Sequence, residues 1–457
     1  MATLLKNCRI YDGTGSDAVN GSVLFEGDRI IEVGDVDESR ADSVIDLEGR
    51  SLASGFIDPH SHNDWFAIKT EPLKYFEPFI RQGITTFVTG NCGLSAIGFD
   101  DDTPYKDKIG GGLFFFNGTT GKYCSIKEFN AAIDRNMPCN IATLVGHCSA
   151  RTSVSGYENR KLSAQEEEKM LGILEDNLRD GAAGVSLGLM YEPGLYADTE
   201  ELKKVVKLCC KYNKPLTVHP RAESKVSMSY DSLFGRSHLL RAEDELVEIS
   251  KGTNLKLQHS HAIFVGRQSF GDKDESFARQ FRIVLRESGV DAMFDIYNET
   301  LGVSVITVVL PVWYQGMSKE ERKKPLNKLK LSVLIKATSI LLGFGFKDIQ
   351  IAYIGPGYEK YEGKTVHEIA KENGKSDLDM YLQLCEESDF KGRVNMGPYS
   401  TPEIIREFEH NPNCLYMTDA GSRISAFRTR LSMTAIRSSC AILSEVRATL
   451  CPTPSAA

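Results

Sequence analysis

The chain has 457 residues, of which 41% are hydrophobic and 25% are charged, and its formal net charge is −8. This acidic balance, without a basic stripe, excludes a general nucleic-acid binder, and no apolar run approaches the roughly 18 residues that a membrane span needs. The first residues lack the apolar core of a signal peptide, and the eleven cysteines form no CxxC pair. We therefore expect a cytoplasmic protein with free thiols.

Residues 1–50 predict a small β unit. Short alternating or β-branched runs are separated there by turn clusters rich in glycine and aspartate. The predicted strands cover residues 4–10, 21–25, 29–33 and 43–47. The segment contains no histidine and one cysteine, so we assign it a structural role.

From residue 51 onward, apolar strand candidates alternate with helical patterns. The strand candidates cover residues 55–57, 84–89, 141–146, 184–189, 216–219, 255–261, 291–295, 349–354 and 414–418. Helices are predicted over 163–178, where Ser163 and Glu166 form a capping box, and over 199–212 and 401–408. This alternation implies a parallel sheet and predicts an α/β fold with a closed (β/α)8 TIM-like barrel.

The barrel is predicted to occupy residues 51–435, followed by a short divergent tail over 436–457. The nine strand candidates are one too many for the barrel, so one of them is expected to lie outside it. A Lys-rich segment with helical character, at about 315–375, is predicted to be an insertion between the last two barrel strands.

Polar side chains stand where many of these strands end. Six of the nine histidines do so, namely His60, His62, His147, His219, His259 and His261. Cys92 follows the second strand, and Asp419 follows the last one. Because the carboxyl ends of barrel strands converge, these side chains are expected to share one site. Residues two apart on a strand point the same way, so His60 and His62 should hold one metal ion, and His259 should share a face with His261.

These residue types suit a zinc hydrolase. Imidazole and thiolate are good zinc ligands, and a catalytic zinc keeps a position open for water. Zinc lowers the pKa of such a water to about 7 and polarises a carbonyl group. Asp419 would move a proton from the water to a leaving nitrogen. The pattern predicts metal-assisted hydrolysis of an amide-like bond.

Each candidate also has a purely structural interpretation. Cys92 could be a small buried hydrophobe, and Asp419 could be a helix N-cap. His147 is predicted to support the ligands or the core rather than to bind metal directly. Arg221 could pair with a carboxylate inside the site or with Glu223 outside it.

The order of these residues resembles the amidohydrolase superfamily, whose members are metal-dependent barrels that often carry an N-terminal β-sandwich. Within it, the chain resembles the N-acyl-D-amino-acid deacylases, or D-aminoacylases, over roughly residues 3–435. The matching stretches are 11–15, 55–58, 90–93, 144–147, 184–188, 193–194, 260–261 and 418–419, together with Tyr191, His219, Arg221 and Glu223.

This resemblance implies a role for each residue. Cys92 would be a ligand able to bridge two ions, and His219 and His261 would complete the tighter zinc site. His60 and His62 would serve a second, weaker site. Asp419 would be the general acid and base, and Tyr191 and Arg221 would line the substrate pocket. His259 and His147 would support the ligands.

Two departures from the family concern residues that bind the substrate carboxylate. Relatives usually carry a lysine where this chain has Ile263, and a His-Pro-Arg motif after the catalytic aspartate that is absent here. Arg423 is the candidate replacement, because a bidentate guanidinium suits a carboxylate. The strands with which relatives complete the β-sandwich near their C-terminus are expected to be missing.

We therefore predict a zinc-dependent hydrolase of linear N-acyl-D-amino acids. The expected partners are one or two zinc ions and a small-molecule substrate, without nucleic acid or membrane, and the oligomeric state is not predicted. One alternative is a cyclic-amide hydrolase of the hydantoinase or dihydroorotase kind. Such enzymes usually bridge their metals with a carboxylated lysine, and the strand candidate 184–189 contains no lysine. The other is a barrel that has lost catalysis and acts as a binding or scaffold protein.

Overall fold

The computed structural model describes residues 1–108, 123–227, 229–230, 235–276, 290–315 and 317–420. Arg423 and the predicted tail lie outside the described residues. The chain divides into two compact units, Met1–Phe56 and Ile57–Ala457. Among the described helices, none is both long enough and apolar enough to cross a membrane.

The first unit is built on one five-stranded sheet. Its strands are β1 (Ala2–Tyr11), β2 (Val19–Glu26), β3 (Arg29–Gly34), β4 (Ser43–Asp46) and β5 (Ser51–Ala53). β1 is central: it pairs antiparallel with β2 and parallel with both β4 and β5. Leu4, Cys8 and Ile10 of β1 are buried. Their positions differ by even numbers of residues, as expected for a strand with one covered face.

The second unit contains eight strands in barrel order. They are β6 (Phe56–Asp58), β7 (Ile84–Thr89), β8 with β9 (Asn140–Thr143 and Val145–Gly146), β10 (Val185–Gly188), β11 (Pro215–His219), β12 (Lys256–His259), β13 (Asp291–Ile296) and β17 (Cys414–Tyr416). They form two runs of neighbours, β6-β7-β8 and β9-β10-β11-β12-β13-β17. β7 pairs parallel with β8, and every pair of neighbours in the second run is parallel.

Backbone hydrogen bonds join the two runs into a closed ring. Leu144 separates β8 from β9, and its N–H donates to Thr89 of β7, 2.8 Å away. At the other seam, Ser61 and Ala420 form a parallel bridge, and the Asp419 N–H donates to the His60 carbonyl at 3.0 Å. The predicted (β/α)8 barrel is thereby confirmed, and its first and last strands meet at the residues that carry the candidate ligands.

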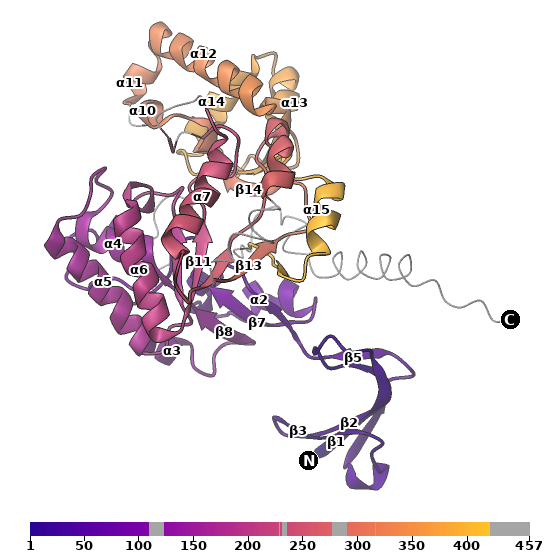
Figure 1. Cartoon of the computed structure of the whole chain (residues 1–457). Helices are drawn as coiled ribbons and strands as arrows, with labels where there is room; N and C mark the ends of the chain where they lie inside the picture. The colour runs from indigo at the N-terminus through magenta and orange to yellow at the C-terminus, as the bar shows by residue number, and fades with distance from the viewer. Residues whose placement is uncertain (109–122, 228, 231–234, 277–289, 316, 421–457) are drawn as a thin grey trace. The chain divides into compact units, whose positions relative to one another are not determined.

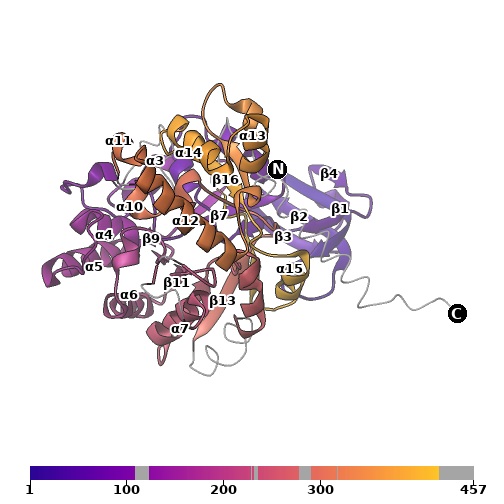
Figure 2. The same ribbon diagram turned by 90° about the horizontal axis from the view of Figure 1, so that it is seen from above.

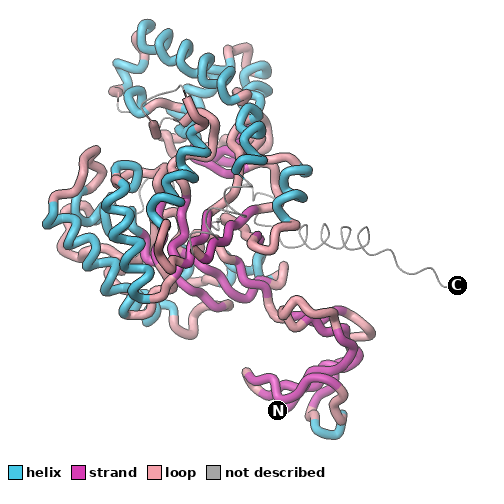
Figure 3. The backbone as a smooth tube through the Cα atoms, in the orientation of Figure 1, coloured by secondary structure: helices cyan, strands magenta, loops and turns pink. Residues whose placement is uncertain are grey.

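Helices surround the parallel strands (Figure 2), while the strands occupy the middle of this unit (Figure 3). The outer helices are α2 (Leu73–Ile80), α3 (Ile126–Ile133), α4 (His147–Ser155), α5 (Ala164–Arg179), α6 (Thr199–Tyr212), α7 (His238–Ser250) and α15 (Pro402–Glu409), and the short α1 (Asp64–Ala67) follows β6. The capping box predicted from Ser163 and Glu166 opens α5.

The ninth strand candidate lies outside the barrel. It is β15 (Ile349–Tyr353), which pairs antiparallel with β16 (Arg393–Met396), and β16 also pairs with β14 (Gly302–Val305). The segment between β13 and β17 therefore begins before the predicted insertion at 315–375 and ends after it. It also holds α10 (Val312–Gln315), α11 (Lys319–Arg322), α12 (Pro325–Leu342), α13 (Val366–Glu372) and α14 (Asp377–Glu387), at one end of the barrel (Figure 1).

Candidate metal centre

Three predicted histidine ligands surround the sulfur of a fourth predicted ligand, Cys92. The Cys92 Sγ lies 3.5 Å from His60 Nε2, 3.6 Å from His219 Nδ1 and 3.6 Å from His261 Nε2. His219 Nδ1 and His261 Nε2 are 3.0 Å apart. All four residues are buried. The side chains come from the ends of β6, β7, β11 and β12, so the convergence predicted from the strand ends is present.

Asp419 joins His60 and His62 in a second, overlapping group. Its Oδ1 lies 3.3 Å from His62 Nε2 and 3.5 Å from His60 Nε2. The donor atoms of His60, His62 and Asp419 could hold one metal ion together, as could those of His60, Cys92 and His261. His60 belongs to both groups, so the two positions are adjacent.

Three of these residues have left-handed backbone conformations. The φ angle is 55° at Cys92, 39° at His261 and 46° at Asp419. Non-glycine residues rarely adopt this region, and such strain gathers at functional sites. The strands end just before each residue, and the left-handed turn directs the side chain into the centre instead of continuing the strand's alternation.

Glycines allow the Cys92 loop to approach β10 closely. A Cβ atom at Gly188 would lie 2.0 Å from the Cys92 carbonyl oxygen and 3.1 Å from the ring of Tyr191. A Cβ at Gly93, where φ is +75°, would lie 2.6 Å from the nitrogen of Gly188. Only glycine fits such backbone contacts. The spacing of the ligands therefore depends on these two positions.

We expect Gly188→Ala to displace Cys92 and lower the zinc content. Overpacking at such a contact should reduce the free energy of unfolding by about 1–3 kcal/mol. The matched control is Gly172→Ala, because a Cβ at Gly172 in α5 meets nothing within 4 Å, and alanine in a helix interior should stabilise by about 1 kcal/mol. Denaturant unfolding and metal analysis of both variants check this. Equal zinc content in the two variants would contradict the packing argument.

Two carboxylates hold the histidine rings. Glu223 Oε1 makes a short contact with His261 Nδ1, and Glu223 Oε2 lies 3.8 Å from His219 Nε2. Asp295 Oδ2 lies 3.3 Å from His60 Nδ1. Metal-binding histidines usually donate their second N–H to such a carboxylate. The sequence pattern gave Glu223 only a place in a family motif and a possible pairing with Arg221, and it gave Asp295 no role, although Asp295 ends a predicted strand.

Charges in this cluster shift several pKa values. Burial opposes ionisation of the Cys92 thiol, but the charge of His60 and hydrogen bonds from His219 and His261 hold its pKa well below the usual range. Burial opposes the charged forms of His60 and His261, yet Asp295 raises the pKa of the first and Glu223 that of the second. Protons on the imidazoles thus balance the surrounding negative charge.

The donor set fits a divalent metal ion. A cation would take the place of the imidazole protons, since metal ligands must be deprotonated. Thiolate and imidazole favour zinc over hard oxygen-seeking cations such as magnesium. His219, Glu223 and His261 form a third group of donor atoms that lie within 4.8 Å of one another. The residues present therefore suit zinc better than calcium or magnesium.

The predicted substrate residues lie in different surroundings. The Tyr191 hydroxyl is 3.3 Å from His219 Nδ1, at the wall of the centre. The guanidinium of Arg221 donates to both carboxylate oxygens of Glu245, at 2.9 Å each, and to the Leu195 and Ala197 carbonyls. Its binding of substrate stays a prediction, as does that of Arg423.

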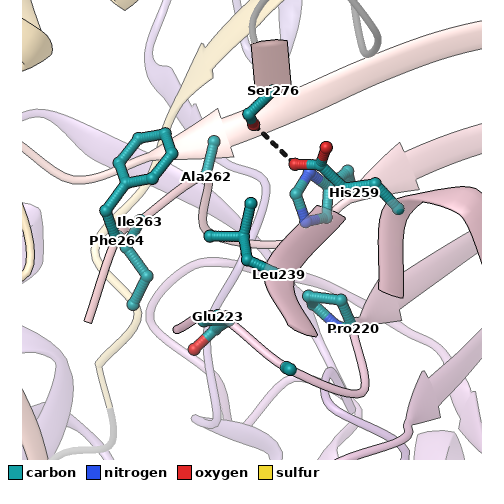
Figure 4. A pocket seen from close by; sticks show the side chains of 10 residues that line it. Pro220, Glu223, Leu239, His259, Ala262, Ile263, Phe264 and Ser276 are labelled. Carbon is teal, nitrogen blue, oxygen red and sulfur yellow. Dashed lines mark hydrogen bonds between the residues drawn. The ribbon is translucent and has the colours of Figure 1, made fainter. Parts of the chain in front are cut away.

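His147 and His259 lie apart from the ligands. His147 Nε2 is 2.8 Å from Glu201, which Arg151 also contacts at 3.0 Å. His259 lines a small cavity, beside Leu239 and Glu243 of α7 (Figure 4). The structure separates His259 from His261, contrary to the predicted shared face, because β12 ends at His259 and the backbone turns at His261.

The comparisons with known proteins agree with this architecture. Residues 43–227 match the family described as the amidohydrolase family. D-aminoacylase from Alcaligenes xylosoxydans xylosoxydans is 25% identical over 384 residues, which cover 83% of this chain and 68% of that protein. N-acyl-D-glutamate deacylase from the same organism is 29% identical over 289 residues, which cover 63% of this chain and 55% of that protein.

A solved structure shares the fold. The N-acyl-D-glutamate deacylase of Bordetella bronchiseptica, complexed with zinc and a phosphonate inhibitor, superposes with a TM-score of 0.72 and 22% identity, over 95% of this chain and 79% of that one. Part of the chain thus matches the amidohydrolase family, and the chain as a whole is similar to D-aminoacylase and N-acyl-D-glutamate deacylase, the proteins that its motifs resemble.

Proposed function

We propose that this chain is a zinc-dependent hydrolase that cleaves the amide bond of N-acyl-D-amino acids, releasing a carboxylate and a free D-amino acid. The observation that carries the proposal is the meeting of Cys92, four histidines and Asp419 in one centre at the ends of the barrel strands. Curated relatives named D-aminoacylase and N-acyl-D-glutamate deacylase support the choice of substrate class.

Cys92, His219 and His261 would hold a tighter zinc ion, and His60 and His62 a weaker one, and Cys92 would be a ligand able to serve both. Bound zinc supplies Lewis acidity, which makes a water molecule more acidic and a carbonyl carbon more electrophilic. Glu223 and Asp295 keep the imidazole rings oriented, since each contacts a ring nitrogen on the side away from Cys92.

Asp419 would move the proton. Burial opposes its ionisation, but the hydrogen bond with His62 and the charge of His60 lower its pKa below the usual range, so it starts as a base. Its side chain is 27% exposed, whereas those of His60 and His62 are 0% and 4% exposed. Asp419 can therefore reach an incoming substrate, accept a proton from water and donate it to the leaving nitrogen.

The test combines metal analysis with a substrate panel. Purified protein is assayed for zinc and for release of free amino acid from N-acetyl-D- and N-acetyl-L-amino acids, with hydantoin and dihydroorotate as cyclic amides. We expect one or two zinc ions per chain, release from the D-series, and loss of both metal and activity on treatment with a chelator. Opening of only the cyclic amides, or absence of zinc, would overturn the proposal.

A further inference from the structure

We infer that Asp295 is a positioning residue that couples the two metal groups, because its one carboxylate fixes a ligand in each of them. This inference rests on the proposed metal centre. Asp295 lies on β13, which contributes no ligand of its own, and its side chain is fully buried. Its side chain contacts His60, which follows β6, and His261, which follows β12.

The Asp295 carboxylate accepts hydrogen bonds from three donors. Its Oδ1 accepts the backbone N–H of His261 at 2.6 Å. Its Oδ2 lies 3.3 Å from His60 Nδ1 and also accepts the side-chain amide of Gln258. An ionised carboxylate has only acceptor sites, enough for all three donors, so His60 Nδ1 must carry the proton of that hydrogen bond.

This arrangement selects the tautomer of His60. With the proton on Nδ1, the lone pair of Nε2 is free to bind metal. Nε2 faces the centre, 3.5 Å from the Cys92 sulfur and 3.5 Å from Asp419 Oδ1. The opposite tautomer would direct an N–H group toward the metal position.

The same carboxylate also secures His261. The backbone there is left-handed, with φ of 39°, a conformation that needs support from its surroundings. The Asp295 Oδ1 holds the N–H of His261, and the Asp295 carbonyl accepts the next N–H, that of Ala262, at 2.9 Å. Through these bonds His261 Nε2 is kept 3.6 Å from the Cys92 sulfur. One residue thus orients a ligand in each metal group.

Asp295→Asn keeps the size of the side chain but removes one acceptor oxygen. The new NH2 group must face at least one of the three donors and cannot accept a hydrogen bond from it. In another enzyme, the same replacement of an orienting aspartate leaves the histidine in the wrong tautomer. We expect zinc affinity to fall on the order of 10–100-fold at both positions. Competition with a chromophoric chelator measures both affinities, and cobalt substitution reports the ligand geometry spectroscopically. Neither measurement requires turnover.

Two further variants sharpen the test. Asp291→Asn lies at the exposed start of the same strand and should leave both affinities unchanged. Glu223→Gln, which acts on His219 and His261 but not on His60, should weaken one zinc ion more than the other. Wild-type affinity at both positions in Asp295→Asn would overturn the coupling, whereas a wild-type protein without zinc would overturn the proposed function itself.

If Asp295→Asn does not fold, nitrogen NMR of the zinc-loaded wild-type protein decides the question. The proton of the His60 ring should reside on Nδ1, and the shift of Nε2 should be that of a metal-bound nitrogen. Zinc bound through His60 Nδ1 would overturn the inference, since Asp295 could not then accept a proton from that nitrogen.

Discussion

Replacement of Asp419 by asparagine is expected to lower kcat for amide hydrolysis by about 10²–10⁴-fold, the usual contribution of a general acid–base. Asparagine keeps an oxygen near His62 but cannot accept a proton from water or return one to the leaving nitrogen. Its size matches that of aspartate, and asparagine tolerates the left-handed φ of 46° at this position. We therefore expect near-native stability and retention of the tighter zinc ion.

The matched control for this variant is Asp389→Asn. Asp389 also has a left-handed backbone, with φ of 49°, but its side chain is 82% exposed and contacts Lys391. It should keep full activity. Steady-state kinetics on the preferred N-acetyl-D-amino acid, with zinc measured on the same samples, provide the comparison. An Asp419→Asn enzyme that retained its rate with zinc bound would show that another group moves the proton.

Replacement of Cys92 by serine is expected to release zinc and abolish activity together. The Cys92 sulfur lies within 3.6 Å of three imidazole nitrogens, and these neighbours hold its pKa well below the usual range, which favours the thiolate that binds metal. A serine hydroxyl stays protonated at neutral pH and binds zinc far more weakly. The loss should exceed the roughly 10–100-fold that follows removal of an outer carboxylate partner.

Cys148 offers the control for this second prediction. It is a buried thiol in the same cluster of side chains, but burial raises its pKa to about 12, and it donates to the Gly188 carbonyl at 3.5 Å. Cys148→Ser should therefore retain zinc and most of the activity. If Cys92→Ser kept two zinc ions per chain, the thiolate would not be a ligand, and the role assigned to Cys92 would be wrong.

The extent of the segment between β13 and β17 could not be predicted from local patterns. Its sheet pairs β14 with β16, and β16 with β15, across long stretches of chain. Of these three strands the sequence predicted only β15, and a local pattern carries no information on which strands will pair. The Lys-rich helical stretch at 315–375 was visible because helices are local, whereas the strands that extend the segment on both sides became part of it only through long-range pairing.

The sequence by itself determined the barrel and predicted the candidate site, because apolar strands recur at regular intervals and polar residues follow their carboxyl ends, namely His60, His62, Cys92, His219, His261 and Asp419. Tertiary structure alone decided where the supporting side chains point. Arg221 turns to Glu245, His259 turns to α7, and Asp295 reaches ligands from two other strands. The physical reason is that strand alternation stops where a strand ends, and beyond that point backbone turns and long-range hydrogen bonds set each direction.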